Sequence, residues 1–475
     1  MSWIVSLPED ISVSAECDEE LVLTSPAARL VLKQLSPASR DALGRLAYPG
    51  EAVGRLVASL PRTHVSTEPA CLFYYLRCLA RRGFLLITAT AGNQRLATVM
   101  PTADTFVLAR GAVSDHPLVL SRFAYIRRMH DELVLESPLS AARVLLHDNR
   151  VALLAHTLAT PTTMTELSKR VPGLPAETVA SLITLLLNSG MLSPVNEHGT
   201  SDEDDHPSIP LWEFHDLLFH ARSRDGRHDS PGKALYPLAR RPEPPPALKP
   251  AAATELITLY RPLPNRLEQE DPPLARVMEQ RRSIREYGEE PITAEQLGEF
   301  LFRVARVKEY AEVEIITVDG PTRLDITSRP YPAAGALYEL EIYPVVRACH
   351  DLDSGLYHYD PFHHRLRRVT RWTAEVEQLL ENASWAAGIP ACNLQVLLVI
   401  TARFHRITWK YEDFSYSLIL KNVGVIYHGM YLAATAMGLA PCAIGVGNSD
   451  LFARAIGSDY YAETSVGEFL LGSKP

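Results

Sequence analysis

Apolar residues recur at helical spacing in several stretches of the C-terminal half of the chain. This spacing predicts helices over residues 274–282, 294–305 and 415–437. Short apolar runs predict strands over residues 340–346, 356–359, 394–401 and 467–471. This order of elements predicts an α+β domain in which helices pack on a mostly antiparallel sheet.

The N-terminal part of the chain contains an internal repeat. The segment Glu-Leu-Val-Leu-Thr-Ser-Pro at residues 20–26 recurs at residues 132–138 with a single change. Each copy continues with predicted helices, the last of which ends at Gly83 or Gly190, and then with a β-prone run. In the first copy, Gly92 offers the turn of a hairpin. We therefore expect two winged-helix domains, over residues 1–105 and 106–200.

Winged helices often bind DNA, so the last helix of each copy was compared with a recognition helix. The stretch 179–187 carries no basic residue, and the stretch 72–80 is mainly aromatic and apolar. A recognition helix without cations cannot neutralise phosphates. The sequence favours peptide or protein binding, with DNA binding as the alternative.

A linker is expected over residues 201–252. It begins with the acidic stretch 201–205, which predicts an exposed connector. Residues 212–220 have the apolar spacing of a helix that docks on a neighbouring domain. The stiff proline-rich segment 240–246 follows. Residues 253–475 then form a separate domain.

The predicted helix 415–437 is apolar nearly all round, and Gly424 and Gly429 would let another element approach closely. A helix that is apolar on every face is buried on every face, so we expect a subunit interface and a homodimer. The alternative is the central core helix of a monomer.

Composition narrows the class of protein. The chain has 475 residues and a net charge of -9, which argues against general affinity for nucleic acid. No apolar run is long enough for a membrane helix, and the acidic first residues do not resemble a secretory signal, so we expect a cytoplasmic protein. The six cysteines form no CxxC pair. Neither a disulfide framework nor a metal site is expected, the pair His363-His364 included.

A basic cluster is the most informative local feature. Residues 281–285 put the guanidinium groups of Arg281, Arg282 and Arg285 and the hydroxyl of Ser283 in a stretch that we predict to be helical. Arginine binds phosphate oxygens through two parallel hydrogen bonds, which favours a phosphorylated cofactor. The alternative is a solvated basic face offset by neighbouring glutamates.

Four segments together resemble a known family. Residues 281–285 (RRSIR) resemble the RRSxR opening of nitroreductase-like flavoproteins. Residues 329–338 (RPYPAAGALY) and 409–412 (WKYE) resemble segments of the SagB-type thiazole/oxazole dehydrogenases, and residues 432–445 match the family's helix and flavin loop. The likeness covers residues 260–475, and the paired front domains fit the longer cyanobactin azoline oxidases.

The resemblance implies FMN at a homodimer interface. Arg281, Arg282 and Arg285 would surround its phosphate with Ser283, and Lys474 is a weaker candidate for the same anion. The ring would contact two segments, of which the first commonly comes from the other subunit: Pro332, Ala333, Ala334 and Gly335, and Ala443, Ile444 and Gly445. Two residues depart from the family pattern, since Ala333 replaces a serine and Glu339 a proline.

The resemblance also implies the reaction. A thiazoline or oxazoline made from Cys, Ser or Thr loses its Cα proton to a base and a hydride from Cβ to the flavin. Lys410 and Tyr411 have suitable chemistry, because a desolvated lysine can lose its proton near neutral pH and a phenol can share the work. The alternative is a surface ion pair between Lys410 and Glu412 or Asp413.

The sequence thus predicts an FMN-dependent azoline oxidase that acts on an azoline-containing precursor peptide. Its front domains resemble modules that bind a leader peptide along a sheet edge. Two other functions stay open: an NAD(P)H-dependent nitro- or flavin reductase, and a non-catalytic peptide-binding or DNA-binding scaffold.

Overall fold

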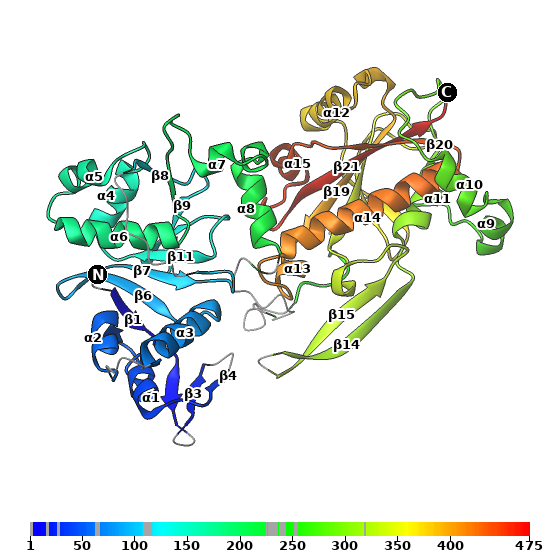
Figure 1. Cartoon of the computed structure of the whole chain (residues 1–475). Helices are drawn as coiled ribbons and strands as arrows, with labels where there is room; N and C mark the ends of the chain where they lie inside the picture. Colours follow the sequence, from blue (N-terminus) through cyan, green and yellow to red (C-terminus); the bar gives the residue numbers. More distant parts are fainter. Residues whose placement is uncertain are drawn as a thin grey trace. The chain divides into compact units, whose positions relative to one another are not determined.

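The computed structural model describes residues 3–15, 19–25, 29–61, 67–107, 116–224, 226, 236, 244–250, 255–317 and 320–475. The chain forms two compact units, Met1–Pro231 and Gly232–Pro475 (Figure 1). Each unit has sheets and a hydrophobic core of its own.

Unit 1 is built on a seven-stranded sheet in which every neighbouring pair is antiparallel. The strands lie in the order β5 (Glu51–Ala52), β1 (Trp3–Ser6), β6 (Leu86–Ala91), β7 (Gln94–Pro101), β11 (Ala142–Leu146), β10 (Glu132–Glu136) and β9 (Tyr125–Met129). Strands of both sequence repeats therefore share one sheet, joined where β7 pairs with β11.

The repeated segment forms a strand in both copies, as the sequence predicts, but the two strands lie in different sheets. The second copy is β10, whereas the first is β3, in a three-stranded sheet of β2 (Ser12–Ser14), β3 (Leu21–Thr24) and β4 (Arg29–Leu32). A further pair joins β8 (Leu118–Leu120) to β12 (Leu192–Pro194).

The helices of unit 1 follow the predicted plan. They are α1 (Pro37–Gly44), α2 (Val53–Ala58), α3 (Glu68–Arg81), α4 (Asn149–Thr157), α5 (Met164–Arg170), α6 (Ala176–Asn188), α7 (Asp202–Asp205) and α8 (Phe214–Arg222), with a 3-10 turn at Ile209–Leu211. Gly83 and Gly190, with φ of 72° and 68°, follow α3 and α6 and reverse the chain there. The hairpin of β6 and β7 turns at Gly92, as expected. The winged-helix assignment itself stays a prediction.

The first part of the predicted linker is more ordered than its composition suggests. Ser201 accepts a hydrogen bond from the backbone N–H of Asp204, whose carboxylate bonds back to Ser201, and this capping box begins α7 within the acidic stretch. The helix α8 buries Leu217, and its Arg222 lies 3.4 Å from a carboxylate oxygen of Glu136 on β10. The predicted docking helix therefore packs on unit 1. Of the proline-rich segment 240–246, residues 240–243 lie outside the described residues.

Unit 2 confirms the α+β class. Its seven strands lie in the order β13 (Leu256–Thr258), β18 (Arg365–Thr370), β17 (Gly355–Asp360), β16 (Leu340–Val346), β19 (Val396–Arg403), β21 (Glu463–Ser473) and β20 (Leu439–Ile444). Every neighbouring pair is antiparallel. A separate hairpin pairs β14 (Glu309–Thr317) with β15 (Gly320–Ser328).

Helices cover both faces of this sheet (Figure 1). They are α9 (Pro264–Glu270), α10 (Leu274–Gln280), α11 (Ala294–Ala305), α12 (Ala374–Ala387), α13 (Phe404–Thr408), α14 (Ser415–Ala436) and α15 (Ser449–Ile456), with 3-10 turns at Ala334–Ala336 and Ala391–Asn393. On β19, Leu398 and Ile400 belong to the core under α11 and α14, and Leu397 and Val399 to the core under α12 and α15. This alternation is the two-residue period of a strand buried on both faces.

The long helix α14 differs from its prediction in one respect. Ile419, Ile426 and Met430 are buried, as expected, but Leu420 and Val425 are each 38% exposed. Apolar side chains of the helix are therefore partly uncovered in the single chain, beside the exposed Lys421 and His428. Among the described residues, no helix combines the length and the apolar character needed to cross a membrane.

Candidate flavin and catalytic site

The basic cluster lies beyond a helix end and not in a helix, which corrects the sequence prediction. The helix α10 ends at Gln280, and the chain from Arg281 is extended. The backbone N–H of Ile284 donates to the carbonyl of Pro441 at 2.9 Å, so the segment runs beside β20. This tertiary hydrogen bond replaces the helical continuation that the local sequence favours.

Tyr431 on α14 organises the cluster. Its hydroxyl lies 2.7 Å from Oγ of Ser283 and accepts a hydrogen bond from the backbone N–H of Ala443 at 2.8 Å. The guanidinium of Arg281 lies 5.4 Å from the centre of its ring. One tyrosine thus joins two segments that the sequence assigns to the flavin. Its only signal in the sequence is a polar group in an apolar helix.

A cavity of about 470 Å³ adjoins the cluster. Arg281, Arg282 and Lys474 line it, together with Glu279 and Thr435 among others. Within the described chain, no carboxylate lies at ion-pair distance from these cations or from Arg285. The arginines are exposed, so the alternative of a solvated basic face stays open beside the predicted phosphate site. Arg285 lies near Cys442, where it opposes the effect of burial, which raises the pKa of that thiol.

The small-residue segment 332–335 lies elsewhere in unit 2, beside the first half of α14. Pro332 and Gly335 are exposed, and Gly335 has a φ of 59°. The backbone N–H of Ala334 donates to Oδ1 of Asn422 at 3.3 Å, while Nδ2 of Asn422 donates to the carboxyl of Glu339 at 2.8 Å. Asn422 therefore holds the loop from the helix, a role that the sequence did not indicate.

Lys410 and Tyr411 face this segment. A Cβ placed on Gly335 would lie 2.7 Å from Nζ of Lys410 and 2.6 Å from the hydroxyl of Tyr411, so both polar groups reach the exposed backbone of the loop. Nζ of Lys410 also lies 5.3 Å from the centre of the Tyr411 ring. The structure thus brings together the predicted catalytic pair and the predicted flavin segment.

Burial shifts the two groups in opposite directions. It lowers the pKa of Lys410 from its usual value, and it raises the pKa of Tyr411, with a smaller contribution from Tyr236. No carboxylate pairs with Lys410 in the part of the chain that the structure describes, so the predicted surface ion pair with Glu412 or Asp413 is wrong. A lysine poised to lose its proton beside a phenol that keeps its own can supply a base and a hydrogen-bond donor.

Glu339, one of the two departures from the family pattern, is fully buried. Burial raises the pKa of its carboxyl, although the hydrogen bond from Asn422 opposes the shift. The residue thus supports the loop through Asn422. The family resemblance identifies Glu339 as a departure from the pattern but assigns no role to it.

Residues 443–445 lie partly in the core and partly at the surface. Ala443 is half-buried, Ile444 is 5% exposed in the core under α12 and α15, and Gly445 is exposed. Only Ala443, Gly445 and the backbone of Ile444 are therefore placed to touch a ligand.

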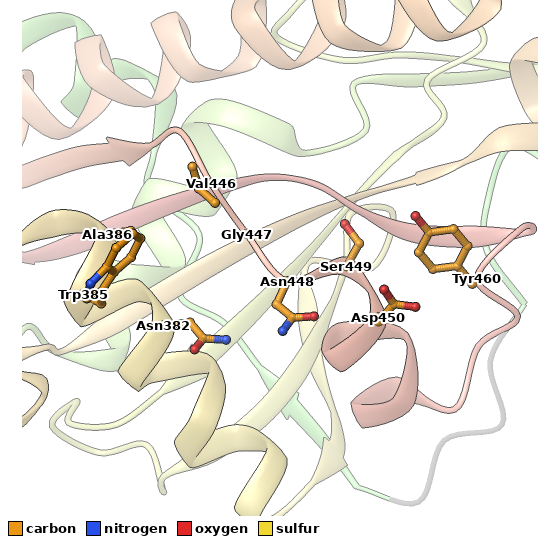
Figure 2. A pocket seen from close by; sticks show the side chains of 9 residues that line it. All are labelled: Asn382, Trp385, Ala386, Val446, Gly447, Asn448, Ser449, Asp450 and Tyr460. Atoms are coloured by element: carbon orange, nitrogen blue, oxygen red, sulfur yellow. The ribbon is translucent and has the colours of Figure 1, made fainter. Parts of the chain in front are cut away.

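A groove of about 470 Å³ opens next to Gly445 (Figure 2). Asn382, Trp385 and Ala386 of α12 line one side, and the loop Val446–Asn448 lines the other. Trp385 is 81% exposed, so its ring is available to a ligand. The groove provides space beside the segment assigned to the flavin.

The candidate site therefore has two parts along α14. Tyr431 marks the basic part and Asn422 the part with Lys410 and Tyr411, and nine helical positions separate these residues by about 13 Å along the axis. A ligand with an anionic tail and a planar head could use both.

Two family models match the chain. The cyanobactin oxidase ThcOx model matches residues 118–229, and the nitroreductase family model matches residues 278–472. The protein named "Putative nitroreductase MJ1384" from Methanocaldococcus jannaschii is 30% identical over 169 residues, which are 36% of this chain and 76% of that relative. The chain belongs to the nitroreductase family.

Two further proteins similar to this nitroreductase-family chain are, by name, a trifolitoxin-processing protein and a microcin synthetase. The trifolitoxin-processing protein TfxB of Rhizobium leguminosarum bv. trifolii is 28% identical over 132 residues, 27% of this chain and 35% of that relative. A chain of the E. coli microcin synthetase McbBCD complex has 19% identity and a TM-score of 0.33, covering 41% of this chain and 70% of that one. The ThcOx and TfxB matches confirm the predicted resemblance to SagB-type azoline dehydrogenases.

A nitroreductase-family protein is an oxidoreductase, and FMN is the family's typical cofactor, so both of these predictions are confirmed. The residues present fit FMN. The cavity with Arg281, Arg282 and Lys474 suits its phosphate, since unpaired guanidinium groups there have no other anion. Gly335 has no Cβ, so Nζ of Lys410 and the hydroxyl of Tyr411 can lie close to the exposed backbone of the segment assigned to the ring.

The adjacent histidines take structural roles. Nδ1 of His363 lies 3.0 Å from Asp360, and His364 is buried between the Tyr359 hydroxyl at 2.8 Å and the carbonyl of Tyr260 at 2.8 Å. Across the described ranges, no group of three His, Cys, Asp or Glu side chains is arranged to hold a metal ion.

Proposed function

We propose that this protein is an FMN-dependent azoline oxidase, which dehydrogenates thiazolines or oxazolines of a precursor peptide to thiazoles or oxazoles. The observation that supports this most is the convergence of Lys410 and Tyr411 on Gly335, because it puts a base and a donor beside the segment assigned to the flavin ring. A nitroreductase that passes electrons from a nicotinamide to a nitro group needs no base for a carbon acid.

The chain's own residues divide the work as follows. The neutral amine of Lys410 takes the proton from Cα of the azoline, and the hydroxyl of Tyr411 donates a hydrogen bond to the ring nitrogen. Asn422 keeps the loop at Gly335 in place for both. FMN, when bound, supplies the acceptor for the two electrons and the hydrogen that leave Cβ. The groove at Trp385 gives the flanking peptide a place to lie.

The active form in this proposal is a homodimer. The exposed side of α14, where Tyr416, Leu420 and Val425 lie together with Lys421 and His428, is the surface that a second copy would bury. Pairing two copies through α14 would bring the basic part of one chain and the Gly335 part of the other toward the same cofactor.

The front residues 1–200 would bind the leader of the precursor peptide. Unit 1 offers unpaired sheet edges, at β2 and β4 in the small sheet and at β5 and β9 in the large one. A leader strand could add to such an edge by main-chain hydrogen bonds. The proposed division is therefore recognition by unit 1 and oxidation by unit 2.

The direct test is to incubate the purified full-length protein with FMN, dioxygen and a thiazoline-containing peptide. The expected product lacks two hydrogens per ring, and its mass and the azole absorbance report it. A protein that binds FMN and leaves the thiazoline unchanged would refute the proposal.

The two other functions give different signals. An NAD(P)H-dependent reductase would bleach its flavin rapidly on addition of NADPH in the absence of peptide. A non-catalytic scaffold would stay colourless after purification with added FMN. The exposed backbone at Gly335 and the unpaired cations near Tyr431 favour a bound flavin over the scaffold.

A further inference from the structure

A second, smaller cavity lies in unit 2, away from both parts of the flavin site. Its volume is about 50 Å³, which is room for a few water-sized groups. Its polar lining comes from Lys249, Arg329, Glu341, His358, Asp360 and Arg367. These residues belong to the end of the linker, the chain before the 332–335 segment, and the strands β16, β17 and β18.

The carboxylates around this cavity are already engaged. Asp360, which is 3% exposed, bonds to Nδ1 of His363 and Nε of Arg365 at 3.0 Å each, and to Arg367. Glu341 is 2% exposed and lies 3.0 Å from Nε2 of His358. It also pairs with Arg403 at 3.1 Å. Asp360 has no free oxygen to offer the cavity, whereas Oε1 of Glu341 has only this ion pair with Arg403 and no hydrogen bond.

Arg329 and Arg367, by contrast, each keep two guanidinium nitrogens without a hydrogen-bond partner. Arg329 is 5% exposed and makes one weak hydrogen bond, from Nη1 to the carbonyl of Leu340 at 3.4 Å. Its Nε and Nη2 are buried without a partner, as are Nε and Nη1 of Arg367. A guanidinium keeps its charge at any physiological pH, so these donors cannot be neutralised by losing a proton.

A count of the charged groups also indicates an excess of positive charge around the cavity. Five cations meet around the cavity: Lys249, Arg329, Arg365, Arg367 and Arg403. They face four carboxylates, which are Glu341, Asp360, Glu463, which binds Lys249, and Glu339, which interacts electrostatically with Arg329. A buried positive charge without a counter-ion is strongly destabilising. The cluster therefore lacks negative charge.

We propose that this cavity binds a small inorganic anion of the size of chloride, held by Arg329 and Arg367. The four unpartnered guanidinium nitrogens are buried donors that make no hydrogen bond within the described residues, and the volume excludes phosphate esters and peptides. The anion would tie the linker end at Lys249 and the strands β17 and β18 to Arg329, three residues before Pro332. It would thus fix the start of the loop at Gly335.

The first experiment follows thermal unfolding of the full-length protein against chloride concentration at constant ionic strength. The balancing anion is 2-(N-morpholino)ethanesulfonate, which is too large for the cavity. The midpoint should rise by roughly 3–6 °C for each tenfold increase in chloride above half-saturation. Arg329→Gln should remove this dependence, whereas Arg371→Gln, a change of an exposed arginine, should keep it.

The second experiment does not depend on a variant that folds. Crystals grown with bromide in place of chloride should show an anomalous peak between Arg329 and Arg367. A cavity that holds only water, or an Arg329 turned onto the unpartnered Oε2 of Glu339, would overturn the proposal. So would a midpoint that is independent of chloride.

Discussion

At the scale of single residues, burial shifts the pKa values of the two candidate catalytic groups in opposite directions. Lys410 and Tyr411 are adjacent and lie in the same half-buried environment, yet desolvation lowers the pKa of the lysine and raises that of the tyrosine. The reason is that burial disfavours the charged form of each, which is the cation for lysine and the anion for tyrosine. One environment therefore shifts both groups toward their neutral forms, an amine that can accept a proton and a phenol that can donate a hydrogen bond.

Lys410→Met should lower kcat for azoline oxidation by about 10²–10⁴-fold, because it removes the base and keeps the bulk of the side chain. In the wild type, kcat should fall as pH drops through the lowered pKa of Lys410, since protonation removes the acceptor. The pH profile of kcat, measured with FMN bound, reports this limb.

The residual kcat of Lys410→Met should no longer fall as the pH drops through the pKa of Lys410. Tyr411→Phe should lower kcat less and keep the limb, and His405→Gln, a change of an exposed residue on α13, should alter neither. An unchanged kcat in Lys410→Met with FMN retained would remove the lysine from the mechanism.

Gly335→Ala tests the contact between this pair and the loop. The added Cβ would meet Tyr411 at 2.6 Å and Lys410 at 2.7 Å, and φ is 59°, so both sterics and backbone oppose the change. Gly388→Ala is a matched control, because Gly388 has a φ of 69° and open space around it. Each variant should lose about 1–2 kcal/mol of unfolding free energy to backbone strain.

Only Gly335→Ala should also lose oxidation, by at least about tenfold. Denaturant unfolding and steady-state rates measure the two effects separately. Equal activity in both variants would mean that the loop at Gly335 lies outside the site.

At the scale of elements, the sequence predicts the buried elements of unit 2 well. Helix α11 has the predicted bounds, and β16 is entirely buried in a run with no competing pattern. The hairpin β14–β15 escapes prediction because few of its residues are fully buried, and polar residues such as Glu312 and Glu314 interrupt its apolar positions. The strand β20 escapes because Pro441 interrupts it, although an edge strand tolerates proline.

The candidate site shows the same limit. Arg281, Lys410 and Gly335 are recognisable because charge and backbone freedom are visible in a sequence. Asn422 and Tyr431 are not, since a helix that is apolar all round gives no indication of which polar side chain faces a ligand loop. Only packing decides that, and it also turns the arginine segment away from helix and onto β20.

The uncovered face of α14 carries its own prediction. Val425→Lys should convert the dimer to a monomer, because two copies of the new charge would be buried together across a two-fold axis. Retention of FMN should fall at least about tenfold with it. Val369→Lys is the control, since Val369 on β18 has the same 38% exposure. Analytical ultracentrifugation and flavin absorbance measure both, and a Val425→Lys protein that stays dimeric would contradict the interface.

At the scale of the whole molecule, the two family matches fall in different units. The match to the nitroreductase family, residues 278–472, lies within unit 2, and the match to the cyanobactin oxidase, residues 118–229, lies within unit 1. The nitroreductase match therefore lies in one compact unit. The cyanobactin oxidase match, which separates this chain from a plain nitroreductase, lies in the other. If unit 1 recognises the substrate, it should change how tightly the peptide binds and not how fast a bound ring reacts.

A comparison of two peptides with the same thiazoline core, one with its leader and one without, tests this on the intact chain. The leader should lower KM by at least about tenfold and leave kcat unchanged, because an added strand on a sheet edge of unit 1 contributes binding energy that is equal in ground and transition states. A leader of the same composition in scrambled order is the control and should give the leaderless KM. Since Lys410, Tyr411 and Gly335 all belong to unit 2, equal KM values for the three peptides would leave azoline oxidation standing and remove leader binding from unit 1.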